Sequence, residues 1–149
     1  MADLFDGKRN ISLDTSYNMD YEAMNAANLG IANIFFLALI IGKRNNTKIA
    51  VNDHRGKEFR PSYFTPLQKD LIYGLVLNLT GSIPVDDKEI TNIYDELIAY
   101  ANGGIQWMRN NVFFDCLNDN GAINIEPQEI IVRFNQMIYD ELNPQQSPF

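Results

Sequence analysis

Apolar residues recur every three or four positions along most of the chain, which is the spacing of one face of an α-helix. The pattern predicts five helices, at about residues 24–41, 66–79, 87–101, 105–117 and 127–142. Local signals mark some of their ends: Thr65 and Pro66 are typical of a helix start, and Gly103-Gly104 is typical of a corner between two helices. Helices of this length joined by short links predict a mainly α fold, a compact bundle of about five helices.

Residues 43–64 lack this periodicity and contain turn-forming sequences. Between the turns lies Lys48-Ile49-Ala50-Val51, which is long enough for one strand, and Glu58 to Tyr63 follows as a candidate partner strand. Pro61 favours an edge or a strand end, because proline cannot donate a hydrogen bond to a neighbouring strand. The sequence therefore predicts a possible small β-hairpin around residues 47–64.

The 149 residues are enough for one domain with its own core. Residues 1–18 are polar and aperiodic, which predicts an extended N-terminal arm. Residues 19–143 carry all the predicted helices and are expected to form a single helical domain. Residues 144–149 are expected to be a flexible tail.

The most apolar stretch, Leu29 to Ile41, is 13 residues long and is interrupted by Gly30 and Asn33. A membrane-spanning helix needs about 20 apolar residues, so this stretch predicts a buried core helix and no membrane contact. The first ten residues lack the apolar core of a signal peptide, and a cytoplasmic location is expected.

Candidate catalytic and metal-binding groups are few. A single cysteine and a single histidine exclude a disulfide framework and any two-histidine metal site. Cys116 and His54 could pair as nucleophile and base, but Cys116 falls on the apolar side of its predicted helix, where free cysteine behaves as a small hydrophobe. The acidic pairs at residues 95–96 and 140–141 lie on polar helix faces. We therefore expect no catalytic residues and no cofactor.

Residues 118–121 resemble part of a calcium-binding loop. If Gly121 occupies the sixth loop position, positions one and twelve are Cys116 and Pro127, where oxygen ligands are required. We expect a polar turn here and no metal, with a weak, distorted calcium site as the alternative.

Charge is unevenly distributed along the sequence. The whole chain has a net charge of −7, yet residues 43–60 hold six of its 12 basic residues against two acids. This segment is therefore +4 and the rest of the chain −11. Its basic residues are the candidate contacts for a partner or for nucleic acid: Lys43, Arg44, Lys48, Arg55, Lys57 and Arg60.

Two interpretations of this basic segment stay open. It can contact phosphate groups or an acidic partner, and the nearby Phe59, Tyr63 and Phe64 would suit base stacking or a protein interface. It can equally be a solvated connector whose charge is balanced by acids packed beside it.

Several segments together resemble a known family. They are Ile34–Ala38 running into Gly42, the basic stretch from Lys43 to Lys48, the aromatic residues 59–64, the helix 71–79, and Tyr100-Ala101-Asn102-Gly103-Gly104-Ile105. Over residues 32–108, about half of the chain, the sequence resembles the family called Dnd-system-associated protein four, small proteins encoded beside DNA phosphorothioation and related anti-phage defence genes. The most specific piece is a structural motif formed by Tyr100, Ala101, Asn102, Gly103 and Gly104.

The resemblance implies a cytoplasmic, prokaryotic accessory protein of a defence locus, with no established active site to carry over. The first hypothesis is a non-catalytic interaction protein that docks on a larger protein component of the defence complex. The alternative is a nucleic-acid-binding module that uses residues 43–60. An enzyme that uses Cys116 or an acidic pair is a third hypothesis. A homo-oligomer is also possible, and exposure of Trp107 or Phe114 would indicate a dimer or partner face.

Overall fold

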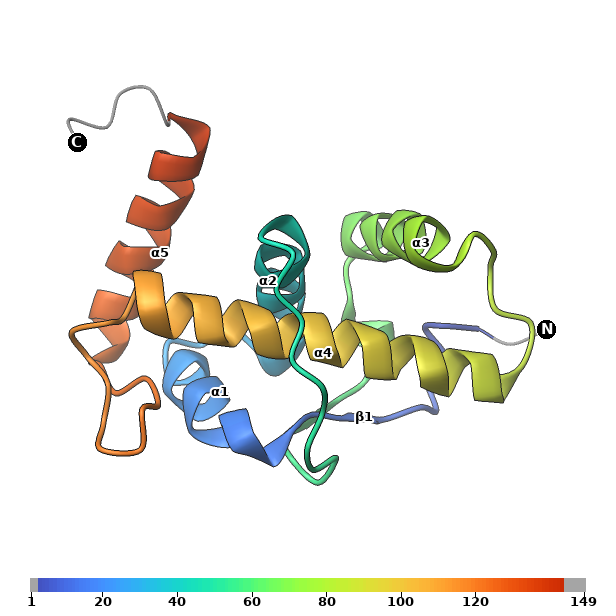
Figure 1. The fold of residues 1–149 in the computed structure, drawn as a ribbon, viewed down its shortest axis with the longest axis horizontal. Coiled ribbons are helices and arrows are strands. Elements are labelled where there is room, and N and C mark those ends of the chain that lie inside the picture. The colour runs from blue at the N-terminus through green and yellow to red at the C-terminus, as the bar shows by residue number, and fades with distance from the viewer. Residues whose placement is uncertain (1–2, 144–149) are drawn as a thin grey trace.

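One long helix, α4 (Asp87–Asn111), runs through the middle of the molecule, and the other helices lie around it (Figure 1). The computed structural model describes residues 3–143, except for the side chains of residues 141 and 142. α1 (Asn18–Asn25) and α2 (Ile31–Arg44) lie beside the middle of α4, while α3 (Pro66–Thr80) and α5 (Pro127–Leu142) lie near its two ends. The described residues thus form five α-helices, which confirms the predicted mainly α fold.

A two-stranded antiparallel sheet pairs β1 (Ile11–Ser12) with β2 (Glu58–Phe59), with Ile11 opposite Phe59. A small antiparallel sheet was predicted, and β2 lies within the range expected for its second strand. The predicted partner, residues 48–51, is wrong, because these residues form no strand and β2 pairs with the N-terminal segment instead. Two short 3-10 helices, η1 (Thr15–Tyr17) and η2 (Pro61–Tyr63), follow the two strands.

The N-terminal segment contributes to the core. Its buried apolar side chains are Leu4, Phe5, Ile11, Leu13 and Tyr17. Phe5 packs edge-on against Tyr73 of α3 at a centroid distance of 5.0 Å. The hydroxyl of Tyr94 on α4 donates a hydrogen bond to the Leu4 carbonyl at 2.6 Å. These contacts tie residues 3–17 of the predicted arm to α3 and α4, while the predicted tail, residues 144–149, lies outside the described residues.

The corner predicted at Gly103-Gly104 is wrong, because α4 continues through both residues to Asn111. A Cβ atom at Gly104 would lie 1.8 Å from the Ala38 carbonyl oxygen, and one at Gly42 would lie 1.8 Å from the Tyr100 carbonyl oxygen. Glycine costs a helix interior about 1 kcal/mol relative to alanine. Here that cost is offset by the close approach of the α2 and α4 backbones, so the glycines mark a helix crossing.

The helix predicted over residues 24–41 is interrupted. α1 ends at Asn25 and α2 begins at Ile31, with Asn28 and Gly30 at φ values of 62° and 87° between them. The Asn25 side chain accepts a hydrogen bond from the Gly30 backbone N–H at 3.0 Å, which holds this turn. The apolar spacing continues across the break, so the periodicity alone did not reveal it.

The signal at the start of α3 is confirmed in detail. The Thr65 hydroxyl accepts from the Gln68 backbone N–H, and the Gln68 side chain accepts from the Thr65 N–H, which completes a capping box. Gly81, at φ 78°, ends the helix. None of the helices in the described part of the chain is both long enough and apolar enough to cross a membrane.

Candidate interaction surfaces

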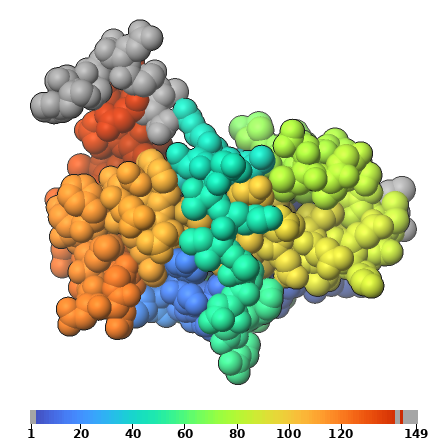
Figure 2. Space-filling model, viewed as in Figure 1, coloured from blue at the N-terminus to red at the C-terminus, as the bar shows by residue number. Residues whose placement is uncertain are grey.

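Residues 45–57, named the strap here, connect α2 to β2 by crossing over α4 (Figure 2). The Ile49 backbone N–H donates to the Ala99 carbonyl of α4 at 3.0 Å, and the Asn102 side chain donates to the Ile49 carbonyl at 3.2 Å. A Cβ atom at Gly103 would lie 2.0 Å from the Thr47 carbonyl oxygen. The strap therefore lies directly on α4 at residues 99–103.

The predicted structural motif, residues 100–104, is divided between two contacts. Gly104 and the Tyr100 carbonyl meet α2, whereas Asn102 and Gly103 meet the strap. Ala101 is fully buried, and the Tyr100 ring lies beneath two lysines, Lys43 and Lys48, each 5.6 Å from its centroid. Each residue of the motif thus lies where α2 and the strap meet α4.

Asp14 joins the strap to the N-terminal segment beneath it. Its buried carboxylate accepts from the Ser16 and Asn52 backbone N–H groups and from the Asn102 side chain, at 2.9–3.1 Å. Burial acts to raise the pKa of Asp14, but the hydrogen bonds from Asn52 and Ser16 outweigh it, and the pKa lies below its usual value of 3.8. The charged carboxylate is therefore the form that the fold stabilises.

The six basic candidates of residues 43–60 do not form one open patch. The ion pairs seen between described side chains include Lys48 with Glu96 at 2.9 Å, Arg55 with Asp53 at 2.9 Å and Lys57 with Glu22 at 2.7 Å. Lys43 and Arg44 lie in the last turn of α2, and Arg60 is exposed just after β2. The acids of α1 and α4 thus compensate part of the +4 charge where the strap crosses them.

The candidate catalytic groups contact different partners. His54 Nδ1 lies 3.8 Å from Asp95 Oδ1 on α4, whereas Cys116 Sγ lies 3.3 Å from its neighbour Asp115. The prediction that Cys116 lies on a helix is wrong, because α4 ends at Asn111. Cys116 is partly exposed. Burial, together with the Asp115 carboxylate, raises the pKa of the Cys116 thiol, which lowers its reactivity as a nucleophile at neutral pH.

The acidic pairs also have local partners. Glu96 binds Lys48 and Asp95 faces His54, so the first pair holds the strap. Asp140 accepts a hydrogen bond from Gln136 one helical turn earlier, at 2.8 Å. Residue 141, the second member of that pair, has no described side chain.

The segment at residues 118–121 is the polar turn that was expected. The Asn118 side chain accepts from the Asn120 and Ala122 backbone N–H groups at 2.9 and 3.0 Å, and Gly121 takes a φ of 81°. Among the described residues, no three His, Cys, Asp or Glu side chains gather closely enough to hold a metal ion.

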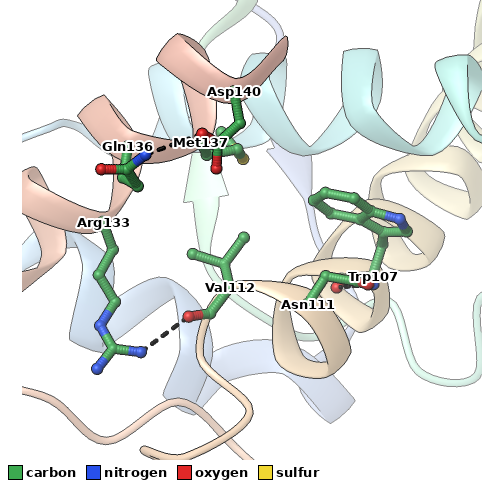
Figure 3. A pocket seen from close by; sticks show the side chains of 7 residues that line it. All are labelled: Trp107, Asn111, Val112, Arg133, Gln136, Met137 and Asp140. Atoms are coloured by element: carbon green, nitrogen blue, oxygen red, sulfur yellow. Dashed lines mark hydrogen bonds between the residues drawn. The ribbon is translucent and has the colours of Figure 1, made fainter. Parts of the chain in front are cut away.

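In the described part of the chain, a cleft separates α5 from α2 and the C-terminal end of α4. Its apolar part is a hollow of about 210 Å³, lined mainly by Leu37, Ile40, Ile41, Trp107, Met137 and Ile138. Its polar part, about 310 Å³, shares Trp107 and Met137 and adds Asn111, Val112, Arg133, Gln136 and Asp140. Figure 3 shows Trp107, Asn111 and Val112 on one side of this part, with the four α5 residues opposite.

The base of the cleft is fixed by α5 contacts. Phe134 packs edge-on against Phe113 at 5.8 Å, and Arg133 donates to the Val112 carbonyl at 2.9 Å. Arg133 also binds Asp115, and this hydrogen bond holds the pKa of Asp115 at about 2. These contacts anchor the first half of α5, while Met137 and Ile138 of its second half line the cleft.

The sequence did not predict this cleft. Trp107 was noted as a candidate partner contact if exposed, and it is half-buried in the cleft wall, while Phe114, which is 66% exposed, follows α4. The cleft depends on how α5 is placed against α2, which periodicity does not encode. Comparisons of the chain with protein-family models, with curated protein sequences and with solved structures find no match.

Proposed function

We propose that the protein is a non-catalytic accessory protein of a prokaryotic anti-phage defence system, linked to DNA phosphorothioation or similar. In this proposal it acts in the cytoplasm and docks on a larger protein component of the defence complex. The observation that carries the docking is the apolar cleft between α2, α4 and α5. The assignment to a defence system rests on the resemblance of residues 32–108 to the family named above.

The chemistry of the cleft suits a protein partner. Two helices, α2 and α5, form its walls, and aliphatic side chains with Trp107 line it. A groove of this kind accepts the apolar side of an amphipathic helix, and tryptophan is among the residues that contribute most to binding energy when a partner covers it. The polar side chains of Gln136 and Asp140 supply hydrogen-bonding groups at the rim.

Nucleic-acid binding through residues 43–60 is the weaker alternative. Positive charge does gather at the end of α2, where Lys43 and Lys48 lie over the same Tyr100 ring. However, Lys48, Arg55 and Lys57 already bind carboxylates, and a phosphate would have to compete with those acids. The proposal therefore gives priority to the cleft.

A pull-down of the tagged protein from its native host, with and without nuclease treatment, tests both hypotheses, protein docking and nucleic-acid binding. We expect a defence protein to be recovered after nuclease treatment, and to be lost with Ile138→Lys in the cleft wall. Val132→Lys is the matched control, since Val132 is an exposed apolar residue of the same helix that does not line the cleft.

Three other results would count against the proposal. Recovery of no protein partner would contradict it, and so would equal loss with both α5 variants. Partners that disappear with nuclease, and with the triple change of Arg55, Lys57 and Arg60 to alanine, would instead support the nucleic-acid reading.

A further inference from the structure

α3 lies at the end of α4 opposite to α5 (Figure 1). Its outer side and the segments that flank it expose apolar side chains. Six large apolar side chains between residues 63 and 85 are 44–70% exposed: Tyr63, Leu67, Leu71, Leu77, Ile83 and Val85. The inner side of the same helix buries Ile72 and Val76 in the core. α3 is therefore apolar on both sides, although only one side has a partner within the described chain.

Gly74 lies in the middle of α3, and a Cβ atom there would meet nothing within 4 Å. Its backbone is helical, so the conformation does not require glycine. At the crossing of α2 and α4, missing Cβ atoms at Gly42 and Gly104 let two helix backbones approach closely. The open space at Gly74 offers the same approach to a helix from outside.

The charge of this surface favours a second copy of the chain. Each copy has a net charge of −7, so two copies repel each other over most of their surfaces. Residues 61–85 contain only two charged side chains, Lys69 and Asp70, and are neutral overall. A depletion of charge together with exposed aliphatic residues is characteristic of the centre of a homodimer interface.

The sequence of this surface is also complementary to itself. In an antiparallel pair of α3 helices with a twofold axis at Gly74, residues equally distant from Gly74 on its two sides face each other. Leu71 then faces Leu77 of the second copy, and both residues are exposed on α3. Asp70 faces Asn78 of the second copy, so a carboxylate meets an amide that can donate to it.

The size of the surface is adequate when the flanking segments take part. Six half-exposed apolar side chains make a patch on the order of several hundred Å², similar to the largest patch on a typical monomer. A stable dimer buries about 800 Å² on each partner. In a dimer of that size the remaining area must come from the polar residues that lie between the apolar ones.

We propose that the protein forms a symmetric homodimer through the outer face of α3, with the two helices antiparallel and crossing at Gly74. The interface includes Tyr63, Leu67, Leu71, Leu77, Ile83 and Val85 of both copies. Because α3 and the cleft lie near opposite ends of α4, each copy keeps its cleft open. The dimer therefore presents two clefts, whether or not the docking proposed above is correct.

Sedimentation equilibrium of the full chain over a range of concentrations tests the dimer. We expect a monomer–dimer equilibrium whose dissociation constant rises about 100-fold or more in Leu71→Lys, because the change places an unpaired charge in an apolar interface. Leu71 is 48% exposed, so the variant should keep the native circular dichroism spectrum. Val132→Lys, the same type of change on α5, should leave the dissociation constant unchanged.

Cysteine cross-linking tests the position of the twofold axis. In a Cys116→Ser background, Gly74→Cys should give a covalent dimer on mild oxidation, because the axis brings position 74 against itself within disulfide reach. Leu67→Cys should not, because residue 67 faces Gly81 of the second copy.

A monomer at every concentration would overturn the proposal and leave the α3 face to a different partner. A dimer that Leu71→Lys does not weaken would place the interface elsewhere. A dimer that Leu71→Lys weakens but that Gly74→Cys does not cross-link would overturn the antiparallel arrangement.

Discussion

At the crossing of α2 and α4, a Cβ atom at Gly42 or Gly104 would lie 1.8 Å from a carbonyl oxygen of the other helix. At Gly74 on α3, a Cβ atom would meet nothing within 4 Å. Glycine therefore occurs in two helix interiors, in one of which a side chain would clash and in the other of which it would have free space. In one region the contact that glycine permits is visible within the chain, and in the other we infer that it forms only between chains.

The two regions also differ in their polar groups. The α2–α4 crossing is covered by the strap, and Asn102 and Asp14 bind each other and the strap backbone. The outer face of α3 carries exposed aliphatic side chains, and of the two charges in residues 61–85 Asp70 is exposed whereas Lys69 lies over the Phe5 ring. Substitutions at the packed crossing should therefore destabilise the monomer. Substitutions on the exposed apolar face of α3 should leave the monomer stable and change the affinity between two copies.

The largest expected difference comes from adding one methyl group at each place. Gly104→Ala should destabilise the fold by more than about 3 kcal/mol, because the Ala38 backbone would have to move. Gly74→Ala should instead stabilise the dilute monomer by about 1 kcal/mol through helix propensity, while weakening the dimer. Urea unfolding at low protein concentration measures both changes. Similar effects of the two substitutions on the monomer would remove the contrast.

A smaller effect is expected from the polar contact between α4 and the strap. Asn102→Ala removes a donor from the Asp14 carboxylate and from the Ile49 carbonyl, which should cost about 1–3 kcal/mol. Asn110→Ala is the control, since Asn110 is exposed on the same helix and should change stability by less than about 0.5 kcal/mol. Hydrogen exchange should show faster exchange at Ile49 and Asn52 in Asn102→Ala alone. Unchanged exchange there would mean that other contacts hold the strap.

These regions also show how much the sequence could predict. Helix starts such as the Thr65 capping box depend on residues three positions apart, and they were predicted correctly. Gly103-Gly104 gave the wrong prediction, because two consecutive glycines occur both at the end of a helix and at a close helix crossing. The partner of β2 could not be predicted, because strands of two residues carry no periodicity and Ser12 and Glu58 lie 46 residues apart.

The candidate surfaces were predictable to different degrees. The uneven charge of residues 43–60 was visible in the sequence, but the acids that compensate it, Glu22 and Glu96, belong to helices whose positions are set by tertiary packing. The cleft depends on the placement of α5 beside α2. The apolar spacing predicted the helix at residues 66–79, and only the structure shows that Ile72 and Val76 fill its inner side while Leu67 and Leu71 are exposed.

The smallest expected effect is a pH dependence of stability that arises at the strap, through Asp14, and not at α3. Because the pKa of Asp14 in the fold lies below its usual value of 3.8, its carboxylate contributes stability at neutral pH, and that contribution is lost as pH falls through the lowered value. Asp14→Asn should therefore be less stable at neutral pH and lose less stability on acidification than the natural chain. The control, Asp119→Asn, changes an exposed acid of a loop and should leave this dependence unaltered.

Hydrogen exchange measured at decreasing pH shows which part of the chain loses stability when Asp14 is protonated. Protonation of Asp14 weakens its bonds to Asn52 and Asn102, so the strap amides should be the first to lose protection, measured against the intrinsic exchange rate at each pH. The amides of Ile72 and Val76 in α3 should keep their protection, because apolar contacts hold that helix and these do not titrate. An equal loss of protection in both regions would mean that acid unfolds the chain as a single unit, and that the strap and α3 do not differ in the way their contacts imply.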